Sequence, residues 1–379
     1  MKKVVVAGYA RSPFTLAKKG ELATVRPDRL AAQVIAGLVA RTKVNVDDIE
    51  DLILGCAFPE GEQGLNMARL VGMMAGLPQS VAGQTINRFC GSSMQSIHSA
   101  AGAIQMGAGE VFVCAGIESM TRVPMMGFNP MPDPDLAAAM PGAYIGMGDT
   151  AENVAARWGI TRAQMEEFAV ASHVKANAAR AAGKFEAEIV PVTDKKGKVV
   201  STDGCIRPET TAEGLATLKP AFSATGLVTA GTSSPLTDGA SATLICSLDY
   251  AEKHGLEPLA AIRSIAVSGC DPEIMGIGPV GSSLKAAARA GIDVKSIDVV
   301  ELNEAFASQA LACIRDLGLD PAKINLDGGA IALGHPLGAT GARIVGKAAS
   351  LMKREGLKTG LATQCIGGGQ GIATILEAL

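Results

Sequence analysis

Short runs of apolar residues alternate along this chain with longer amphipathic stretches, and turn-forming residues separate them. Short apolar runs bounded by turn residues are typical of buried strands, and longer periodic stretches are typical of helices. The pattern predicts strands at residues 2–8, 50–55, 110–116, 259–267, 298–302 and 359–364. It predicts helices near residues 28–42, 92–107, 149–158, 162–182, 305–317 and 340–354. This alternation indicates an α/β fold in which helices cover the faces of a βαβ sheet.

Two pairs of similar segments suggest that the chain contains a duplicated β/α unit. VNVDDIEDLILGC, from Val44, resembles IDVKSIDVVELNE, from Ile292, at an offset of 248 residues. The segment that begins at Gly91 resembles the one at Gly338, and each is a helix of small residues after a glycine-rich loop. A shared offset predicts two equivalent halves.

The region between the two copies differs from both of them in composition. Residues 119–148 hold six methionines and five prolines with little periodicity, and residues 229–241 (TAGTSSPLTDGAS) are expected to return the chain to the core. We therefore predict an N-terminal half at residues 1–118, an inserted domain at 119–250 and a C-terminal half at 251–379.

Composition and charge exclude several classes of protein. The 379 residues are 48 % apolar, which excludes an intrinsically disordered chain. Lys and Arg number 34 against 37 Asp and Glu, with no basic run, which argues against nucleic acid or an anionic membrane as partner. No apolar stretch reaches the ~20 residues of a membrane span. Eight scattered cysteines without a CxxC pair indicate reduced thiols and a cytoplasmic protein, and no metal-binding motif suggests a metal site.

The first candidate for chemistry is Cys90 in TINRFCGSSMQSIH, where a helix is expected to open near Ser92. A helix N-terminus favours the thiolate, because its amide dipoles stabilise negative charge. The competing interpretation is a buried structural cysteine, as we expect for Cys114 in the strand VFVCAG.

The second candidate is His335 in GGAIALGHPLGATGAR, a glycine-rich loop ahead of a helix. Packing explains a histidine poorly in such a loop. His98, His173 and His254 lie in helical stretches, so structural or solvated roles are expected for them.

Two further candidates follow predicted strands of the C-terminal half. Cys365 ends a strand before the glycines of CIGGGQG, whose N–H groups can face a developing oxyanion. Asn303 and Glu304 lie between a strand and a helix, where the alternative is an N-cap with a first-turn carboxylate. Two thiols, one histidine, an amide and a loop of N–H donors suggest covalent acyl transfer. A non-catalytic binding protein or another thiol enzyme remains open on spacing alone.

These motifs together resemble those of the thiolase family. The resemblance rests on NRFCGSSMQSIH, ESM (118–120), NEAFA (303–307), GGAIALGHPLGATGAR and CIGGGQG, which are met in this order from one end of the chain to the other. It implies a duplicated five-layer αβαβα core with an inserted loop domain that binds coenzyme A. Cys365 argues against the related ketoacyl synthases, which use Cys–His–His.

The resemblance also implies roles for the candidate residues. Cys90 would be the nucleophile that takes the acyl group from a 3-ketoacyl-CoA, and His335 would accept its proton. Cys365 would be the second acid and base, which protonates the departing acetyl-CoA carbanion. Asn303 would hold a water that stabilises the enolate oxygen together with His335. The N–H groups of Cys90 and Gly367 would form a second oxyanion hole.

Coenzyme A would be a substrate of this protein, and no permanently bound cofactor is implied. The positions that match family contacts to it are Met147, Arg207, Phe222, Ala230, Ser234, Leu236 and Phe306. NRFCGSSMQ, ESMTRVP and Gly146 favour a degradative 3-ketoacyl-CoA thiolase of β-oxidation over a biosynthetic acetoacetyl-CoA thiolase. A non-enzymatic CoA-binding subunit is a further alternative. Family likeness implies a homodimer or homotetramer, with a β-oxidation complex as an additional partner.

Overall fold

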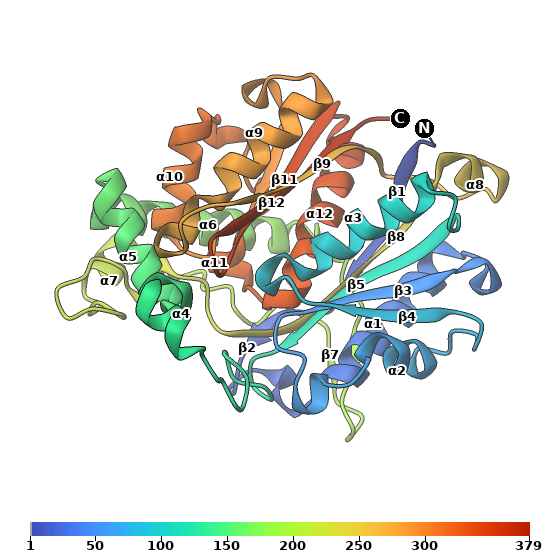
Figure 1. Ribbon diagram of the computed structural model, residues 1–379, viewed down its shortest axis with the longest axis horizontal. Coiled ribbons are helices and arrows are strands. Elements are labelled where there is room, and N and C mark those ends of the chain that lie inside the picture. Colours follow the sequence, from blue (N-terminus) through green and yellow to red (C-terminus); the bar gives the residue numbers. More distant parts are fainter. Residues whose placement is uncertain (1) are drawn as a thin grey trace.

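The computed structural model describes residues 2–379 and contains one large mixed sheet with helices on both faces (Figure 1). The sheet runs in the order β10-β11-β12-β9-β1-β8-β5-β3-β4, with β2 beside β8. Its strands are β1 (Val4–Arg11), β2 (Thr15–Leu16), β3 (Asp51–Cys56), β4 (Ala82–Ile86), β5 (Val111–Ser119), β8 (Thr237–Ser247), β9 (Ala260–Gly269), β10 (Val299–Leu302), β11 (Thr359–Ile366) and β12 (Gln370–Glu377). A separate hairpin consists of β6 (Val192–Thr193) and β7 (Val199–Val200).

The helices lie on both sides of this sheet and in the segment that joins the two halves. They are α1 (Pro27–Thr42), α2 (Met67–Met74), α3 (Ser92–Gln105), α4 (Pro134–Ala139), α5 (Met147–Trp158), α6 (Arg162–Ala181), α7 (Ala212–Ala216), α8 (Leu248–Lys253), α9 (Gly278–Ala290), α10 (Ala307–Leu317), α11 (Ala330–Leu333) and α12 (Thr340–Glu355). Among residues 2–379, no helix has both the length and the apolar character that a membrane crossing requires.

The strand order confirms the duplication that the repeats predict. In the first half the order is β1-β8-β5-β3, and in the second it is β9-β12-β11-β10, element for element. The two halves join where Val5 and Val6 of β1 pair with Ala261 and Ala260 of β9. The predicted repeat also places α3 opposite α12, and both helices lie between the two halves of the sheet in Figure 1.

Three apolar clusters fill the spaces between five layers. One packs α1 and α2 against the outer face of the first half-sheet, and another packs α9 and α10 against the outer face of the second. The third surrounds α3 and α12 between the two half-sheets. Alternate residues of β3 serve different clusters, since Leu52 faces the first and Ile53 faces the central one, as the two-residue period of a strand requires. The αβαβα expectation is confirmed.

Small residues allow the two central helices to approach closely. A Cβ at Gly341 of α12 would collide with the backbone of Met94 in α3, and a Cβ at Gly346 would collide with the ring of Tyr9. Glycine at these two positions therefore lets α12 pack tightly against α3 and β1.

One predicted boundary needs correction at the end of the insertion. The stretch 119–250 contains α4 to α7 and the β6–β7 hairpin, but its last part forms β8. β8 lies in the sheet between β1 and β5, with which it pairs over most of its length. This strand was not predicted because its sequence, TDGASATLICS, begins with small and polar residues and not with an apolar run. All eleven residues are nevertheless buried. β5 and β8 correspond to β11 and β12, so the insertion replaces the short turn that joins the latter pair.

Candidate functional site

Cys90 lies where the chain turns from β4 into α3, close to the junction of the two halves. The turn is fixed by Ser92, whose hydroxyl accepts a hydrogen bond from Arg88 N at 2.9 Å and donates one to Phe89 O at 2.6 Å. Phe89 has φ of +42°, an uncommon conformation for a residue with a side chain. Its strained backbone therefore sits directly before the thiol, as is common where the surrounding contacts over-determine a functional loop.

The thiol of Cys90 is buried, with 9 % of the residue exposed. Burial raises the pKa of Cys90 to about 11, while the N–H groups of Gly367 and of Cys90 itself act in the opposite direction. Burial therefore opposes the thiolate that the helix N-terminus was expected to favour, because desolvation outweighs these two N–H groups. Cys90 needs a base to become a nucleophile.

His335 is oriented as such a base. Its Nδ1 lies 2.6 Å from Thr340 Oγ1, and that hydroxyl donates its own hydrogen to Pro336 O at 3.1 Å. We assign the single hydrogen of this hydroxyl to Pro336 O, and with that assignment Oγ1 accepts from Nδ1–H and Nε2 is unprotonated. Burial lowers the pKa of His335 to about 3, with the charge of Arg343 as a second cause. The imidazole is therefore neutral and has its lone pair on Nε2.

Asn303 faces this lone pair from the end of β10. Its Nδ2 lies 3.4 Å from His335 Nε2, and its backbone N–H donates to Thr363 O at 3.0 Å. Its Oδ1 is buried and has no hydrogen-bond partner among residues 2–379. Buried polar atoms are nearly always satisfied, so this oxygen is a ready acceptor for a water or a ligand.

Cys365 is the penultimate residue of β11. It is 1 % exposed, and burial followed by the charge of Cys90 raises its pKa well above the ordinary value. Gln364 Nε2 donates to Cys90 O and ties the two cysteine loops together. The structure thus brings Cys365, Cys90 and Gly367 together, and it pairs Asn303 with His335.

Two buried carboxylates organise the loops around these side chains. Glu304 accepts hydrogen bonds from Ser172 Oγ at 2.7 Å, Asn325 Nδ2 at 2.7 Å and Ile331 N at 3.1 Å. The capping interpretation of Glu304 is therefore wrong, because α10 begins only at Ala307. Glu118 has the same kind of environment and is described below.

Sequence reasoning missed three residues of this site: Thr340, Gln364 and the role of Glu118. The only available signal was position, since Thr340 and Gln364 stand next to motifs already singled out and Glu118 belongs to the motif ESM.

Comparison with known proteins places this geometry in one family. Residues 4–249 match the family described as "Thiolase, N-terminal domain", and residues 256–378 match "Thiolase, C-terminal domain". The chain belongs to the thiolase family. It is 48 % identical to the 3-ketoacyl-CoA thiolases of Bacillus subtilis (strain 168) and of Aliivibrio fischeri, over all of this chain and all of each relative.

Solved thiolase structures are similar along the whole chain. Human mitochondrial 3-ketoacyl-CoA thiolase in complex with CoA is 38 % identical with a TM-score of 0.92, covering 100 % of this chain and 98 % of that one. The acetyl-CoA acetyltransferase of Bacillus anthracis is 40 % identical with a TM-score of 0.93, covering 100 % and 99 %. These likenesses extend to both halves and to the insertion.

Three of the predicted CoA contacts of this thiolase lie together beside Cys365. The ring of Phe222 meets that of Phe306 edge to face, with centroids 5.9 Å apart, and a Cβ at Gly148 would collide with Phe222. Met147 lies in one apolar cluster with Phe306 and Cys365.

The remaining contacts predicted for CoA lie on loops of the inserted segment. Ser234 donates from its N–H and its hydroxyl to Ala305 O, at 2.9 and 3.1 Å. Arg207, Ala230 and Leu236 are exposed to solvent. Only Arg207 among the predicted contacts carries a positive charge, so phosphate binding there cannot rest on a broad basic patch.

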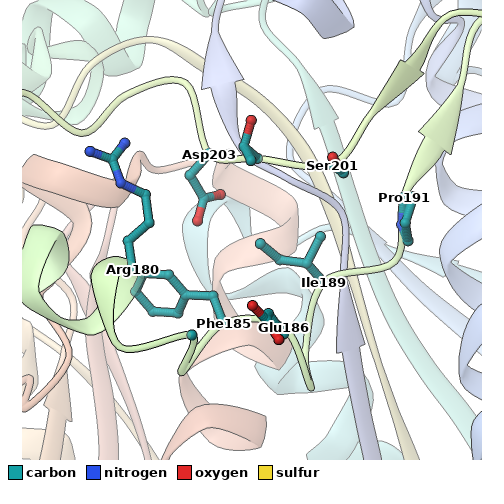
Figure 2. A pocket seen from close by; sticks show the side chains of 9 residues that line it. Arg180, Phe185, Glu186, Ile189, Pro191, Ser201 and Asp203 are labelled. Carbon is teal, nitrogen blue, oxygen red and sulfur yellow. The ribbon is translucent and has the colours of Figure 1, made fainter.

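A cavity of about 360 Å³ lies elsewhere on the insertion and contains none of the predicted site residues (Figure 2). Its walls come from residues 180–191 and 201–203, and Asp203 within it is held by Arg11 at 2.7 Å. This ion pair already satisfies the carboxylate. The candidate site therefore rests on the geometry of its side chains and not on this cavity.

Proposed function

We propose that this acyltransferase cleaves 3-ketoacyl-CoA thiolytically, with Cys90 as nucleophile and with coenzyme A as the second substrate. The observation that carries the proposal is the state of His335. Its Nδ1–H is held by Thr340 and its free Nε2 lone pair points toward the Asn303 amide, so a neutral base is already formed inside the site. A protonated buried thiol and a neutral imidazole together suit proton transfer that is coupled to nucleophilic attack.

The first half-reaction forms an acyl-enzyme. His335 Nε2 takes the proton of Cys90 as the sulfur attacks the 3-keto carbon, and the N–H groups of Cys90 and Gly367 stabilise the resulting oxyanion. The bond between C2 and C3 then breaks, and its electron pair passes to the acetyl-CoA enolate. Cys365 donates its proton to C2, which releases acetyl-CoA. Removing one oxyanion donor typically costs about 10²–10³ in rate.

The enolate oxygen needs its own donors during this step. His335 carries a proton on Nε2 at that moment, and the unpartnered Oδ1 of Asn303 suits a bound water beside it. The second half-reaction reverses the proton movements. The Cys365 thiolate deprotonates coenzyme A, whose sulfur attacks the acyl group, and Cys90 recovers its proton from His335 as it leaves.

We propose that coenzyme A lies along the inserted segment. Phe222, Phe306 and Met147 would line the path of the pantetheine toward the cysteines, while Arg207, Ala230, Ser234 and Leu236 would contact the remainder. The clustering of the first three beside Cys365 supports this direction of approach.

We also propose that the active form is at least a homodimer in the cytoplasm. β4 forms an edge of the sheet, and Leu65, Met73 and Met74 nearby are exposed to 87, 47 and 51 %. Apolar side chains beside an open strand edge suit pairing with a second copy. Sedimentation analysis tests this, and a monomer at micromolar concentration would contradict it.

The degradative reaction is preferred over biosynthetic condensation of two acetyl-CoA molecules. The support lies in Gly146 and in the names of relatives that are 48 % identical. Measuring kcat/KM along a series of 3-ketoacyl-CoA lengths separates the two, because activity confined to the four-carbon substrate would favour the biosynthetic enzyme.

Two cysteine variants test the assigned roles. Cys90→Ser should abolish turnover and the acyl-enzyme adduct, because an alcohol is a far weaker nucleophile than a thiol. Cys365→Ala should still acquire the acyl group at Cys90 in mass spectra but should not complete the cycle. Turnover that persists in Cys90→Ser would overturn the proposal. A chain that binds CoA with neither turnover nor adduct would indicate a non-enzymatic subunit.

A further inference from the structure

Glu118 is a buried carboxylate that the mechanism above does not use. It is the penultimate residue of β5 and is 1 % exposed. Within residues 2–379 no lysine or arginine forms an ion pair with it. Burial raises the pKa of Glu118, and the groups that act in the opposite direction are hydrogen-bond donors without charge. A carboxylate held in the interior by neutral donors alone is costly, since its desolvation is repaid only if every donor is well placed.

Its donors come from three separate segments. Glu118 Oε2 accepts from Ala57 N at 2.8 Å and from Gly338 N at 3.0 Å. Oε1 accepts from Gln63 Nε2 at 2.7 Å and from Phe58 N at 3.4 Å. One side chain therefore binds the loop after β3 to the loop before α12, which are contributed by different halves of the duplicated core.

The first of these loops forms a wall of the nucleophile site. Ala57 packs in one cluster with Cys90, and the ring of Phe58 lies 6.0 Å from that of Phe89, the strained residue that precedes the thiol. Displacement of this loop would therefore release the turn that carries Cys90.

The second loop carries the base. Gly338 follows His335 by three residues and precedes Thr340, which holds the imidazole. A Cβ at Gly338 would lie 3.0 Å from Glu118 Oε2, so the backbone approaches the carboxylate as closely as a glycine permits. Leu337, which lies between His335 and Gly338 in the sequence, packs in one apolar cluster with Cys90.

We propose that Glu118 is a positioning residue that clamps the Cys90 wall and the His335 loop to each other and so sets the geometry of proton transfer between the two. This inference rests on the proposed roles of Cys90 and His335. It assigns Glu118 no contact with substrate and no proton of its own.

The clamp requires a carboxylate and not an amide. Gln63 is fixed, because its Oε1 accepts from Ser119 N at 2.6 Å and its Nε2 also donates to Phe58 O at 2.8 Å. A glutamine at position 118 would therefore turn an NH₂ group either toward the Gln63 donor or toward the two backbone N–H groups. In either orientation the NH₂ group would face another hydrogen-bond donor, so the bonds to one of the two loops would be lost.

Electrostatics alone would not favour a carboxylate here. The charge of Glu118 contributes to the raised pKa of Cys90, which opposes formation of the thiolate. Removing the charge should by itself make Cys90 more acidic and more reactive. A positioning role and a purely electrostatic role therefore predict opposite effects on turnover.

The experiment compares wild type, Glu118→Gln and Glu118→Asp with the control Asp298→Asn. Asp298 accepts at a single oxygen, Oδ2, from Lys358 N, Thr359 N and Thr359 Oγ1 at 3.0–3.1 Å, so the control makes the same carboxylate-to-amide change where β11 begins, far along the strand from Cys365. Measurements are kcat and KM for thiolysis, the pH dependence of Cys90 alkylation by iodoacetamide, and the melting temperature.

For Glu118→Gln we expect kcat to fall about 10–100-fold, as for a displacement of reacting groups by about 1 Å. KM should change less than about threefold, and Cys90 alkylation should shift to lower pH. Asp298→Asn should keep wild-type kcat. Glu118→Gln with wild-type or higher kcat would overturn the clamp.

If Glu118→Gln does not fold, Glu118→Asp decides, because it keeps the charge but shortens the reach to Gly338. The clamp predicts a lower kcat with an unchanged alkylation profile, and a wild-type kcat would overturn it. The wild-type protein is measured in every assay. Absence of turnover in the wild-type protein would contradict the proposed function. Wild-type turnover in both Glu118 variants would contradict the clamp alone.

Discussion

Replacing Thr340 by valine should weaken catalysis by changing the tautomer of His335. The Thr340 hydroxyl is the acceptor for Nδ1–H, and valine has nearly the same shape without that oxygen. Pro336 O loses one donor but keeps Ala339 N at 2.9 Å and Thr340 N at 3.1 Å. The loss therefore falls on the imidazole, which must either bury an unpaired N–H or move its hydrogen to Nε2.

The size of the effect follows from the burial of the ring, which is 4 % exposed. Leaving a buried donor without an acceptor costs about 1–3 kcal/mol. If the ring escapes this cost by protonating Nε2, the lone pair turns away from Asn303 and the base is lost. Restoring the active tautomer for each turnover then costs a similar energy, which corresponds to about 5- to 150-fold in kcat/KM.

The assay measures thiolysis kinetics and the rate of Cys90 acylation, with Thr340→Ser as the matched control. Serine keeps the hydroxyl at the same position of α12, so it should remain within about threefold of wild type. Valine should slow acylation without a comparable change in melting temperature. Equal acylation rates for the valine and serine variants would refute the assignment of Nε2 as the basic nitrogen.

Two further results are expected. Burial lowers the pKa of His98 and His335 to about 3 and that of His173 to about 4, so the unfolded chain takes up protons below about pH 6.5 that the folded chain does not. Stability should be fully present well above pH 6.5 and should fall by about 4 kcal/mol at pH 5.5 in urea unfolding; a constant free energy of unfolding over this range would contradict the burial of neutral rings. Phe222→Ala should raise KM for coenzyme A about two- to tenfold with little change in kcat, since Phe222 stacks on Phe306 and is 44 % exposed toward the proposed path. The control is Phe128→Ala, which removes another exposed phenylalanine. A similar rise in KM in this control would contradict a specific contact between Phe222 and coenzyme A.

Much of the architecture could be predicted because each strand and helix carries its own local pattern. Residues 307–317 and 340–355 form α10 and α12 within two residues of the predicted ranges. β8 escaped prediction because its burial depends on neighbours on both sides, β1 and β5, and not on large apolar side chains of its own. The fold of a strand that is rich in small residues is set by the sheet around it.

The residues proposed to react carry a similar local signal, whereas the residues that support them do not. Cys90 and His335 stand in glycine-rich loops before helices, which is a local signal. Glu118 and Gly338 are 220 positions apart, and the local sequence around neither residue predicts the hydrogen bond between them. The elevated pKa of Cys90 is likewise a property of the assembled interior, where desolvation exceeds the effect of the helix terminus.

The equivalent placement of α3 and α12 has a consequence for how such a site can arise. Cys90 stands at the start of one of these helices, and His335 with Thr340 stands at the start of the other. One copy thus contributes the proposed nucleophilic sulfur, and the other contributes the imidazole together with the second thiol, Cys365. The proposed chemistry needs groups from both copies, so neither half of the core could carry it alone.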